Sequence, residues 1–424
     1  MRNSLALIFA FFFGIATIDA QKKSFFYDNG AYREDIRTVL LYRDGFELSQ
    51  PVMDLGEDVR LILKFDDLSG VVKNYSYTFI HCDAAWNESF LRQNEYIEGF
   101  ADNPVTDYAN SFNTTFRFVN YMVSFPDEKV RFKLSGNYVI LIYEGSRDNV
   151  VLTRRFHIVE PKVTIEGTVK RATLDAFKGE NHEIDFRILH PGFRILNPNE
   201  EVKAVVTQNN RWDNAIRNLK PLYIRNGSLE YDYNTENVVP AGNEFRYFDL
   251  RTVKQVREGV IQTSFFRPYY HVDLVEGEIR KGKKYFSYRE MNGNFVVESQ
   301  DRVNDYDTEC DYFFTHFSLL MDAPLLGGSV NVFGALTDWK TNKGNEMTWN
   351  FETHRYELTL LLKQGYYNYQ FAYQPEGSVT TDHTNLEGSF WECENDYQVY
   401  IYYRQSGGRY DRLIGYRQLN SGLN

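Results

Sequence analysis

Hydrophobic and polar residues alternate along much of the chain with the period of two that is typical of a β-strand. The clearest case is residues 74–82, where one face would carry Tyr75, Tyr77, Phe79 and His81 and the other Ser76, Thr78, Ile80 and Cys82. Residues 59–65 alternate in the same way. The segment between the two contains Asp66, Asp67, Ser69 and Gly70, which are residue types that favour turns. The pattern therefore predicts two strands joined by a turn.

A loop rich in aromatic residues follows the second strand and extends to about residue 100. It is too apolar for a plain solvated linker and too irregular for a helix. Its Trp86, Tyr96 and Phe100 either lie buried beneath the loop's own backbone or form a recognition surface, because aromatic residues are enriched where proteins anchor on one another. We take these three residues as candidates for contact with a partner.

Seven strand signals occur within residues 25–160, which is the pattern of an immunoglobulin-like sandwich. They cover residues 36–41, 59–65, 74–82, 111–118, 121–125, 137–143 and 150–159. Glu160-Pro161 then ends this first domain, because proline cannot extend a central ladder. A second β-rich domain is expected over residues 161–300, followed by a short acidic linker and a third domain over residues 310–424.

The third domain has a distinctive order of short motifs. A strand signal ends in Phe333-Gly334, a short loop carries Asp338-Trp339, and a later strand begins with Gly365-Tyr366-Tyr367. This order resembles early-set immunoglobulin-like modules related to glycogen-binding domains. The resemblance implies a β-sandwich, and it offers an alternative set of candidates for a carbohydrate-stacking platform: Trp339, Trp349, Tyr366 and Tyr367. The two tryptophans equally suit a role as core or interface anchors, which we favour.

Composition supports an all-β fold of tandem immunoglobulin-like sandwiches, since 33 phenylalanines and 31 tyrosines favour pleated, half-buried surfaces. A formal net charge of −11 repels phosphate backbones, which argues against nucleic acid as a partner. Residues 1–20 resemble a cleaved secretory signal, with an apolar run that is too short to cross a bilayer. We therefore expect an exported protein with no transmembrane segment of its own after cleavage.

The polar residues do not form a recognisable catalytic or metal-binding motif. There is no glycine-rich phosphate loop, clustered cysteine set or nucleophile elbow. His81 and Cys82 are adjacent in a predicted strand, so they would point to opposite faces and would not act together. Of the three cysteines, Cys82 is expected to be a small buried hydrophobe, and Cys310 and Cys393 are left as a possible disulfide pair. We expect neither enzymatic activity, nor a cofactor, nor a metal.

The wording FDDLSGVVKNYSYTFIHCDAAWN, followed by EYIEGF, SFNTTF and LSGNYVILIYE, resembles the N-terminal domain of the type IX secretion system plug proteins. The resemblance extends with gaps over most of the chain. It implies a periplasmic protein of the Bacteroidetes that binds the periplasmic mouth of the outer-membrane translocon barrel and closes it in the absence of substrate. The alternative is a carbohydrate-binding protein that uses its C-terminal domain. A hydrolase is a third possibility, but the chain offers no acid or nucleophile for it.

Overall fold

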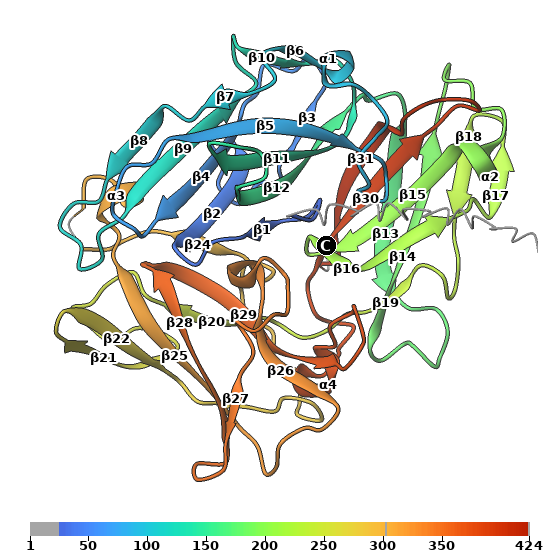
Figure 1. Cartoon of the computed structure of the whole chain (residues 1–424). Coiled ribbons are helices and arrows are strands. Elements are labelled where there is room, and N and C mark those ends of the chain that lie inside the picture. The colour runs from blue at the N-terminus through green and yellow to red at the C-terminus, as the bar shows by residue number, and fades with distance from the viewer. Residues whose placement is uncertain (1–24, 302, 423–424) are drawn as a thin grey trace, which may run out of the picture.

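The computed structural model describes residues 25–301 and 303–422, and over these residues the chain is built of β-strands with short helices between them (Figure 1). This confirms the predicted all-β class. The strands assemble into three sandwiches, and the expected signal peptide at residues 1–20 lies outside the described residues. No helix within them is both long enough and apolar enough to cross a membrane.

The first sandwich packs a six-stranded sheet against a four-stranded sheet. The six-stranded sheet contains β1 (Gly30–Ala31), β12 (Val150–Val159), β11 (Gly136–Glu144), β5 (Tyr75–Cys82) and β7 (Asn103–Pro104) in that order, with β3 (Val52–Asp54) paired to β12. The four-stranded sheet contains β2 (Ile36–Arg43), β4 (Leu61–Asp67), β9 (Val119–Phe125) and β8 (Asp107–Asn110). The helix α1 (Gln93–Tyr96) and a ribbon of β6 (Ile97–Gly99) and β10 (Val130–Phe132) lie at one end.

The second sandwich is built from two distant parts of the chain. One sheet contains β13 (Thr164–Arg171), β14 (Asn181–Leu189), β18 (Ser228–Tyr231) and β17 (Tyr223–Arg225), with β19 (Val238–Pro240) paired to β14. The other contains β16 (Arg211–Leu219), β15 (Val202–Gln208), β30 (Asp396–Tyr403) and β31 (Arg412–Asn420), and the helix α2 (Pro198–Glu201) precedes β15. In Figure 1 the last two strands, in red, therefore lie among green strands.

The third sandwich occupies the chain between β19 and β30. One sheet contains β20 (Arg246–Asp249), β29 (Gly365–Pro375) and β24 (Phe295–Val297), with β26 (Gly328–Phe333) also paired to β29. The other contains β21 (Val260–Phe266), β22 (Tyr269–Leu274), β25 (Tyr312–Leu320), β28 (Arg355–Lys363) and β27 (Thr348–Asn350), with β23 (Gly277–Glu278) paired to β25. The short helices α3 (Tyr306–Glu309), η1 (Ala335–Thr337) and α4 (Thr384–Glu387) connect its strands.

Local alternation explains the individual strands. In β4, Leu61, Leu63 and Phe65 point into the first core and are fully buried, as the period of two predicts. Each such side chain contributes about 1.5–3 kcal/mol by leaving water. The opposite face of β4 is also covered, because it meets the third sandwich.

Two expectations differ from the structure. Residues 111–118 form a loop instead of a strand, because Asn113 takes a left-handed φ of 57° and Phe116 and Phe118 pack against rings of the third sandwich. The expected domain boundaries at residues 300 and 310 do not match the strand pairing, since β30 pairs with β15. We propose instead three units: residues 25–160, residues 161–240 with 396–422, and residues 241–395.

A buried ion pair joins the first and third sandwiches. The Lys363 ammonium lies 2.7 Å from the Asp66 carboxylate, and both side chains are at most 1% exposed. The Tyr312 hydroxyl donates to the same carboxylate oxygen over 2.6 Å, and the Asn120 amide donates to the other oxygen over 2.8 Å. The ammonium also lies 4.3 Å from the centre of the Phe118 ring. Asp66 was expected in a turn, but it lies within β4, one residue before its end, and neutralises a charge from the third sandwich.

Hydrogen bonds between buried groups join the first and second sandwiches. The Ala84 amide donates to the Asp411 carboxylate over 3.0 Å, and the Tyr402 hydroxyl donates to the Asn137 side-chain oxygen over 2.8 Å. The Glu160 amide also donates to the Leu413 carbonyl over 2.8 Å. Water is excluded from most of these contacts, so separating the sandwiches would leave polar groups without partners.

Replacing Asp66 by alanine is expected to lower the free energy of unfolding by roughly 3–5 kcal/mol, because the Lys363 ammonium stays buried without a counter-charge. Guanidinium denaturation followed by tryptophan fluorescence measures the change. Asp175→Ala is the matched control, because Asp175 and Lys178 form an exposed pair whose loss should leave the midpoint unchanged. Equal midpoints for the two variants would contradict the role given to Asp66.

Candidate functional site

A small cavity of about 140 Å³ lies where the three sandwiches meet, and we call it the junction cavity. All three sandwiches contribute to its wall. Lining residues that matter below are Arg154, Arg155 and His157 from the first, Trp212 and Tyr400 from the second, and Asp338 and Trp339 from the third. Charged and aromatic side chains from all three sandwiches therefore meet at this cavity.

Arg155 of β12 lies between two indole rings. Its guanidinium carbon is 4.2 Å from the centre of the Trp86 ring and 5.5 Å from that of Trp212. It donates from Nε to the Tyr27 carbonyl over 2.9 Å and forms an ion pair with Asp28 over 3.1 Å. Burial lowers the pKa of Arg155 to about 10, and the negative charge of Asp28 opposes this shift. The arginine remains charged at neutral pH and fastens the two tryptophans together.

His157 lies two residues further along the same face of β12. Its ring stacks on Trp212 with centroids 5.8 Å apart and lies 4.6 Å from the ring of Tyr400. Neither ring nitrogen has a hydrogen-bond partner among the described residues. Burial lowers the pKa of His157 to about 3, and the charge of the neighbouring Arg155 lowers it further. The imidazole is therefore neutral at physiological pH and acts as an aromatic packing group.

The third sandwich enters this junction through the Asp338-Trp339 loop, where both residues take a left-handed φ of 56°. Asp338 accepts a hydrogen bond from Arg154 over 3.0 Å and forms an ion pair with it. Trp339 packs edge-on against Phe245 and Phe333, and its ring leaves no room for a side chain at Gly293. The aspartate-tryptophan motif thus anchors the third sandwich and does not present a flat ring to solvent.

The expected partner-contact residues differ in their exposure. Trp86 and Tyr96 are buried, at 3% and 6% exposed, so no partner can reach them in this structure. Trp86 packs at the junction, while the Tyr96 hydroxyl donates to the Phe79 carbonyl inside the first sandwich. Phe100 is 69% exposed, between β6 and β7. Only this last candidate lies on the surface, and the exposed Phe90 of the same loop was missed.

The four residues of the alternative carbohydrate platform are not brought together. Tyr366 and Tyr367 are successive residues of β29 and face opposite sides: Tyr367 is buried against Phe248, whereas Tyr366 stacks on Tyr247. Trp349 lies on β27, in the sheet opposite to that of β29, and packs on Tyr356. The Asp338-Trp339 loop instead follows β26, which pairs with β29. The structure provides no common face on which these four rings would stack against a sugar.

Among the described residues, the histidine and cysteines that the sequence analysis considered are not brought into a catalytic arrangement. His81 packs on Tyr138, while Cys82 lies on the other face of β5 in a cluster with Trp86 and Val139. Cys310 and Cys393 are each buried as free thiols, so they do not form the disulfide that the sequence left open. Burial raises the pKa of the Cys310 thiol to about 12, which makes it a poor nucleophile.

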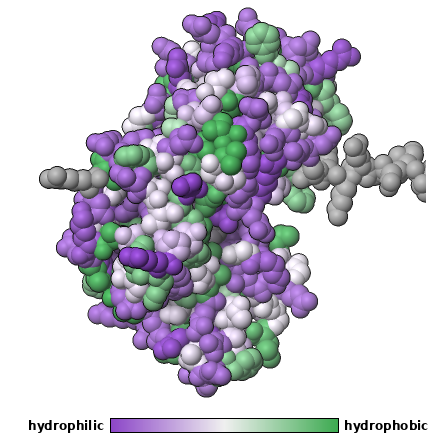
Figure 2. Space-filling model, turned by 60° about the vertical axis from the view of Figure 1, so that its left-hand side comes forward, coloured by the Kyte–Doolittle hydropathy of each residue, from purple (hydrophilic) through white to green (hydrophobic). Residues whose placement is uncertain are grey.

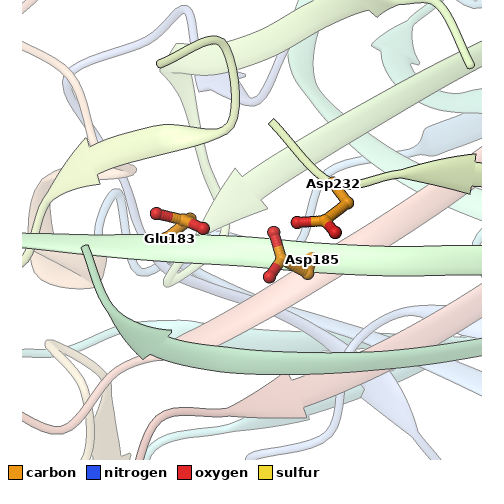
Figure 3. Close-up of side chains that lie close together, drawn as sticks. All are labelled: Glu183, Asp185 and Asp232. Atoms are coloured by element: carbon orange, nitrogen blue, oxygen red, sulfur yellow. The ribbon is translucent and has the colours of Figure 1, made fainter. Parts of the chain in front are cut away.

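Three carboxylates gather on the second sandwich, where Glu183 and Asp185 project from β14 and Asp232 follows β18 (Figure 3). Their oxygens lie within 4.8 Å of one another. The Lys170 ammonium pairs with both Glu183, over 3.0 Å, and Asp185, over 2.5 Å. A lysine thus already supplies the positive charge that this cluster requires, and we assign it no metal.

Sequence reasoning missed the residues that make the junction, namely Arg154, Arg155, His157 and Trp212. A signal was present, because Thr153, Arg155 and His157 place polar groups at every second position of a strand whose other residues, apart from Arg154, are apolar. Such a row on a predicted central strand indicates that its face is covered by something polar or aromatic. Nothing in the local pattern identifies the covering segment.

A family model and a solved structure are similar to this chain. Residues 36–160 match the family model described as the type 9 secretion system plug protein 1st domain, which corresponds to most of the first sandwich. The crystal structure of a hypothetical protein from Parabacteroides merdae is 36% identical, with a TM-score of 0.91, and the match covers 93% of this chain and 100% of that one.

Other solved structures are much less similar. The C-terminal domain of the antigen I/II polypeptide BspA from Streptococcus agalactiae is 9% identical with a TM-score of 0.16, covering 90% of this chain and 97% of that one. The corresponding domain of AspA from Streptococcus pyogenes is also 9% identical with a TM-score of 0.16, covering 91% and 99%. These two carry no argument. A search of curated proteins gives no match.

Replacing His157 by phenylalanine is expected to flatten the dependence of stability on pH. Below pH 6.5 the unfolded chain protonates this histidine while the folded chain keeps it neutral, so the free energy of unfolding falls from about pH 6.5 toward about pH 3. Between pH 7 and pH 5, the variant should lose about 2 kcal/mol less than the wild type. Guanidinium denaturation at both pH values measures this difference.

His354→Gln is the control, because His354 is exposed and its replacement should leave the pH dependence as it is. Wild-type pH dependence in the His157→Phe variant would mean that His157 titrates normally in the folded chain. The buried junction described above would then be wrong.

Proposed function

Because the chain belongs to the type IX secretion system plug protein family, we propose that it binds the periplasmic mouth of the outer-membrane translocon barrel and closes the pore while no substrate passes. The family membership gives a role in type IX secretion. Closing of the pore is the more specific part of the proposal. The observation that supports it is that buried charges join the three sandwiches in a fixed arrangement.

Closing a wide pore requires a body that does not deform and an interface that can be released. Lys363 with Asp66 and Arg154 with Asp338 link the first sandwich to the third through buried or half-buried pairs. Asp411 links the first to the second, since it accepts from the Ala84 amide. Buried links of this kind are costly to break, so the three sandwiches would move together as one stopper.

We further propose that the mature protein is periplasmic and is exported through cleavage of residues 1–20. The apolar run in that segment supports export. We also propose a binding role without catalysis, which is supported by the separation of His81 from Cys82 on opposite faces of β5 and by the raised pKa of the buried Cys310 thiol.

The exposed part of the aromatic loop is our candidate for contact with the barrel. Phe90 is 91% exposed and Phe100 is 69% exposed, and both belong to the same loop. The loop that carries them is held from beneath by Trp86 and Tyr96, and Arg409 of the second sandwich pairs with Glu95 beside Phe90. The buried aromatics thus position the exposed ones.

The test is a pull-down of the tagged protein from detergent-solubilised envelope, with mass spectrometry of the proteins that are retained. We expect the large translocon barrel to be the dominant partner. The double substitution Phe90→Ala with Phe100→Ala should reduce its recovery at least about fivefold, because exposed aromatic anchors carry much of an interface's affinity. Phe351→Ala is the control, since Phe351 is 77% exposed on the third sandwich.

Two results would count against the proposal. Recovery of cytoplasmic proteins alone would remove the periplasmic role altogether. Recovery of polysaccharide or of glycan-uptake proteins, without the barrel, would favour the carbohydrate-binding alternative. If the double variant recovers as much barrel as the wild type, the barrel is still the partner, but the contact lies outside the aromatic loop.

A further inference from the structure

The outermost strand of the third sandwich, β21, is an open sheet edge without a single charged residue. Its seven residues, Val260 to Phe266, pair with β22 on one side, and no strand among the described residues pairs with the other. We propose that two copies of this chain join through their β21 strands, antiparallel, so that one sheet continues across a two-fold dimer. This dimer goes beyond the proposed pore closure and does not depend on it.

An open edge of this kind normally requires protection. Successive residues of a strand direct their backbone groups to alternate sides, so every second residue of β21 points an N–H and a C=O away from β22. Natural sheets blunt such edges with charges, proline or short strands, because otherwise the free groups pair with another chain. β21, whose sequence is VIQTSFF, contains neither a charge nor a proline. Its one irregularity is a β-bulge at Ile261, near the start of the strand, and its pairing with β22 is regular from Gln262 to Phe266.

The other edge strands of the described chain are protected in these ways. Those of comparable length carry charges, as with Arg37 and Arg43 in β2, Glu166 and Lys170 in β13, Arg211 and Asp213 in β16, and Arg412 and Arg417 in β31. The uncharged β26 is different, because residues 345–347 bond to its second side. By contrast with these strands, β21 is both long and uncovered.

The side chains of β21 are also exposed. Ile261 is 57%, Phe265 49% and Phe266 65% exposed. The strand lies at the outer margin of the molecule in Figure 1, on the side that Figure 2 brings forward, where hydrophobic patches stand between hydrophilic residues. Apolar side chains on an open edge are a risk for aggregation unless a second strand covers them.

The sequence of β21 complements itself in an antiparallel arrangement. With Thr263 on the two-fold axis, Gln262 would lie opposite Ser264 of the second copy, and Ile261, at the bulge, would lie near Phe265 of the second copy. Apolar residues thus meet apolar ones and polar residues meet polar ones, and such cross-strand pairs stabilise sheets. A hydrophobic edge strand without charge pairs best with another uncharged strand, and β21 of the second copy is such a strand.

The charges at the two ends of β21 favour the same arrangement. Glu258 precedes the strand and Arg267 follows it; both are exposed, and neither forms an ion pair within the described chain. About 30 Å of extended strand separates them, so they do not meet within one copy. Antiparallel pairing brings Glu258 of each copy close to Arg267 of the other, at both ends of the ladder. Parallel pairing would place like charges together.

Light scattering coupled to size-exclusion chromatography, over a dilution series of the purified protein, tests this proposal. We expect a mass twice that of the monomer at high concentration. Thr263→Lys should raise the dissociation constant at least about tenfold, because it places two lysines opposite each other on the axis. Leu326→Lys, at an 86% exposed residue of the same sandwich, is the matched control and should leave it unchanged.

Charge reversal distinguishes self-pairing from pairing with another protein. Glu258→Arg alone should weaken the dimer about three- to tenfold, since two like-charge contacts arise per dimer. Adding Arg267→Glu should restore wild-type affinity, because the opposite charges meet again. Circular dichroism of each variant checks that the fold is retained.

Several results would overturn the dimer. One is a wild-type protein that stays monomeric up to its solubility limit. Another is a dimer that Thr263→Lys does not weaken. A third is a double variant, Glu258→Arg with Arg267→Glu, that dimerises more weakly than Glu258→Arg alone. If the wild type is monomeric and Thr263→Lys instead loses the translocon barrel in the pull-down, then β21 binds another protein and the second copy is excluded.

Discussion

A single buried charge constrains how the domains can be arranged. The Lys363 ammonium is out of water, and among the described residues the Asp66 carboxylate of another sandwich is its one counter-charge. An unpaired ammonium in such a place costs several kcal/mol, so β4 of the first sandwich and β28 of the third must stay together. Tyr312 donates to the oxygen that pairs with Lys363 and Asn120 donates to the other oxygen, so both oxygens of the carboxylate are hydrogen-bonded and the contact is specific for one geometry.

The discontinuous second sandwich strengthens this constraint. The chain leaves it after β19, builds the third sandwich, and returns to add β30 beside β15. The third sandwich is therefore attached by two connections as well as by its contact with the first. Around the junction cavity, Arg155 between Trp86 and Trp212 and Arg154 beside Asp338 bring the three units to one point. A body tied in this way has little freedom to bend.

Much of the secondary structure follows from the sequence, because strand alternation is a local property. The period of two predicts β4 and β5 and the all-β class, and it also separates His81 from Cys82 and Tyr366 from Tyr367. Applied to the last pair, it already argues against a shared carbohydrate platform. Pairing between distant strands is different. β15 and β30 are about 190 residues apart in sequence, and the sequence of neither strand identifies the other as its partner.

Side-chain roles were harder to predict where they depend on a second domain. Asp66 is a residue type that favours turns and lies beside other such residues, yet its carboxylate forms an ion pair with Lys363. Trp86 looks like a surface anchor in an aromatic-rich loop, but the second sandwich covers it with Trp212. Phe100 has no such cover and remains exposed. The distinction is made by tertiary contacts that the local sequence does not contain.

The central claim is that this rigid body closes the translocon pore, and dye release from liposomes tests it most directly. Liposomes containing the purified barrel would be loaded with a fluorescent dye, and the protein would be added on the side that corresponds to the periplasm. The account predicts that release slows to the rate of barrel-free liposomes and recovers when the protein is removed. Unchanged dye release from barrels that have bound the protein would contradict it.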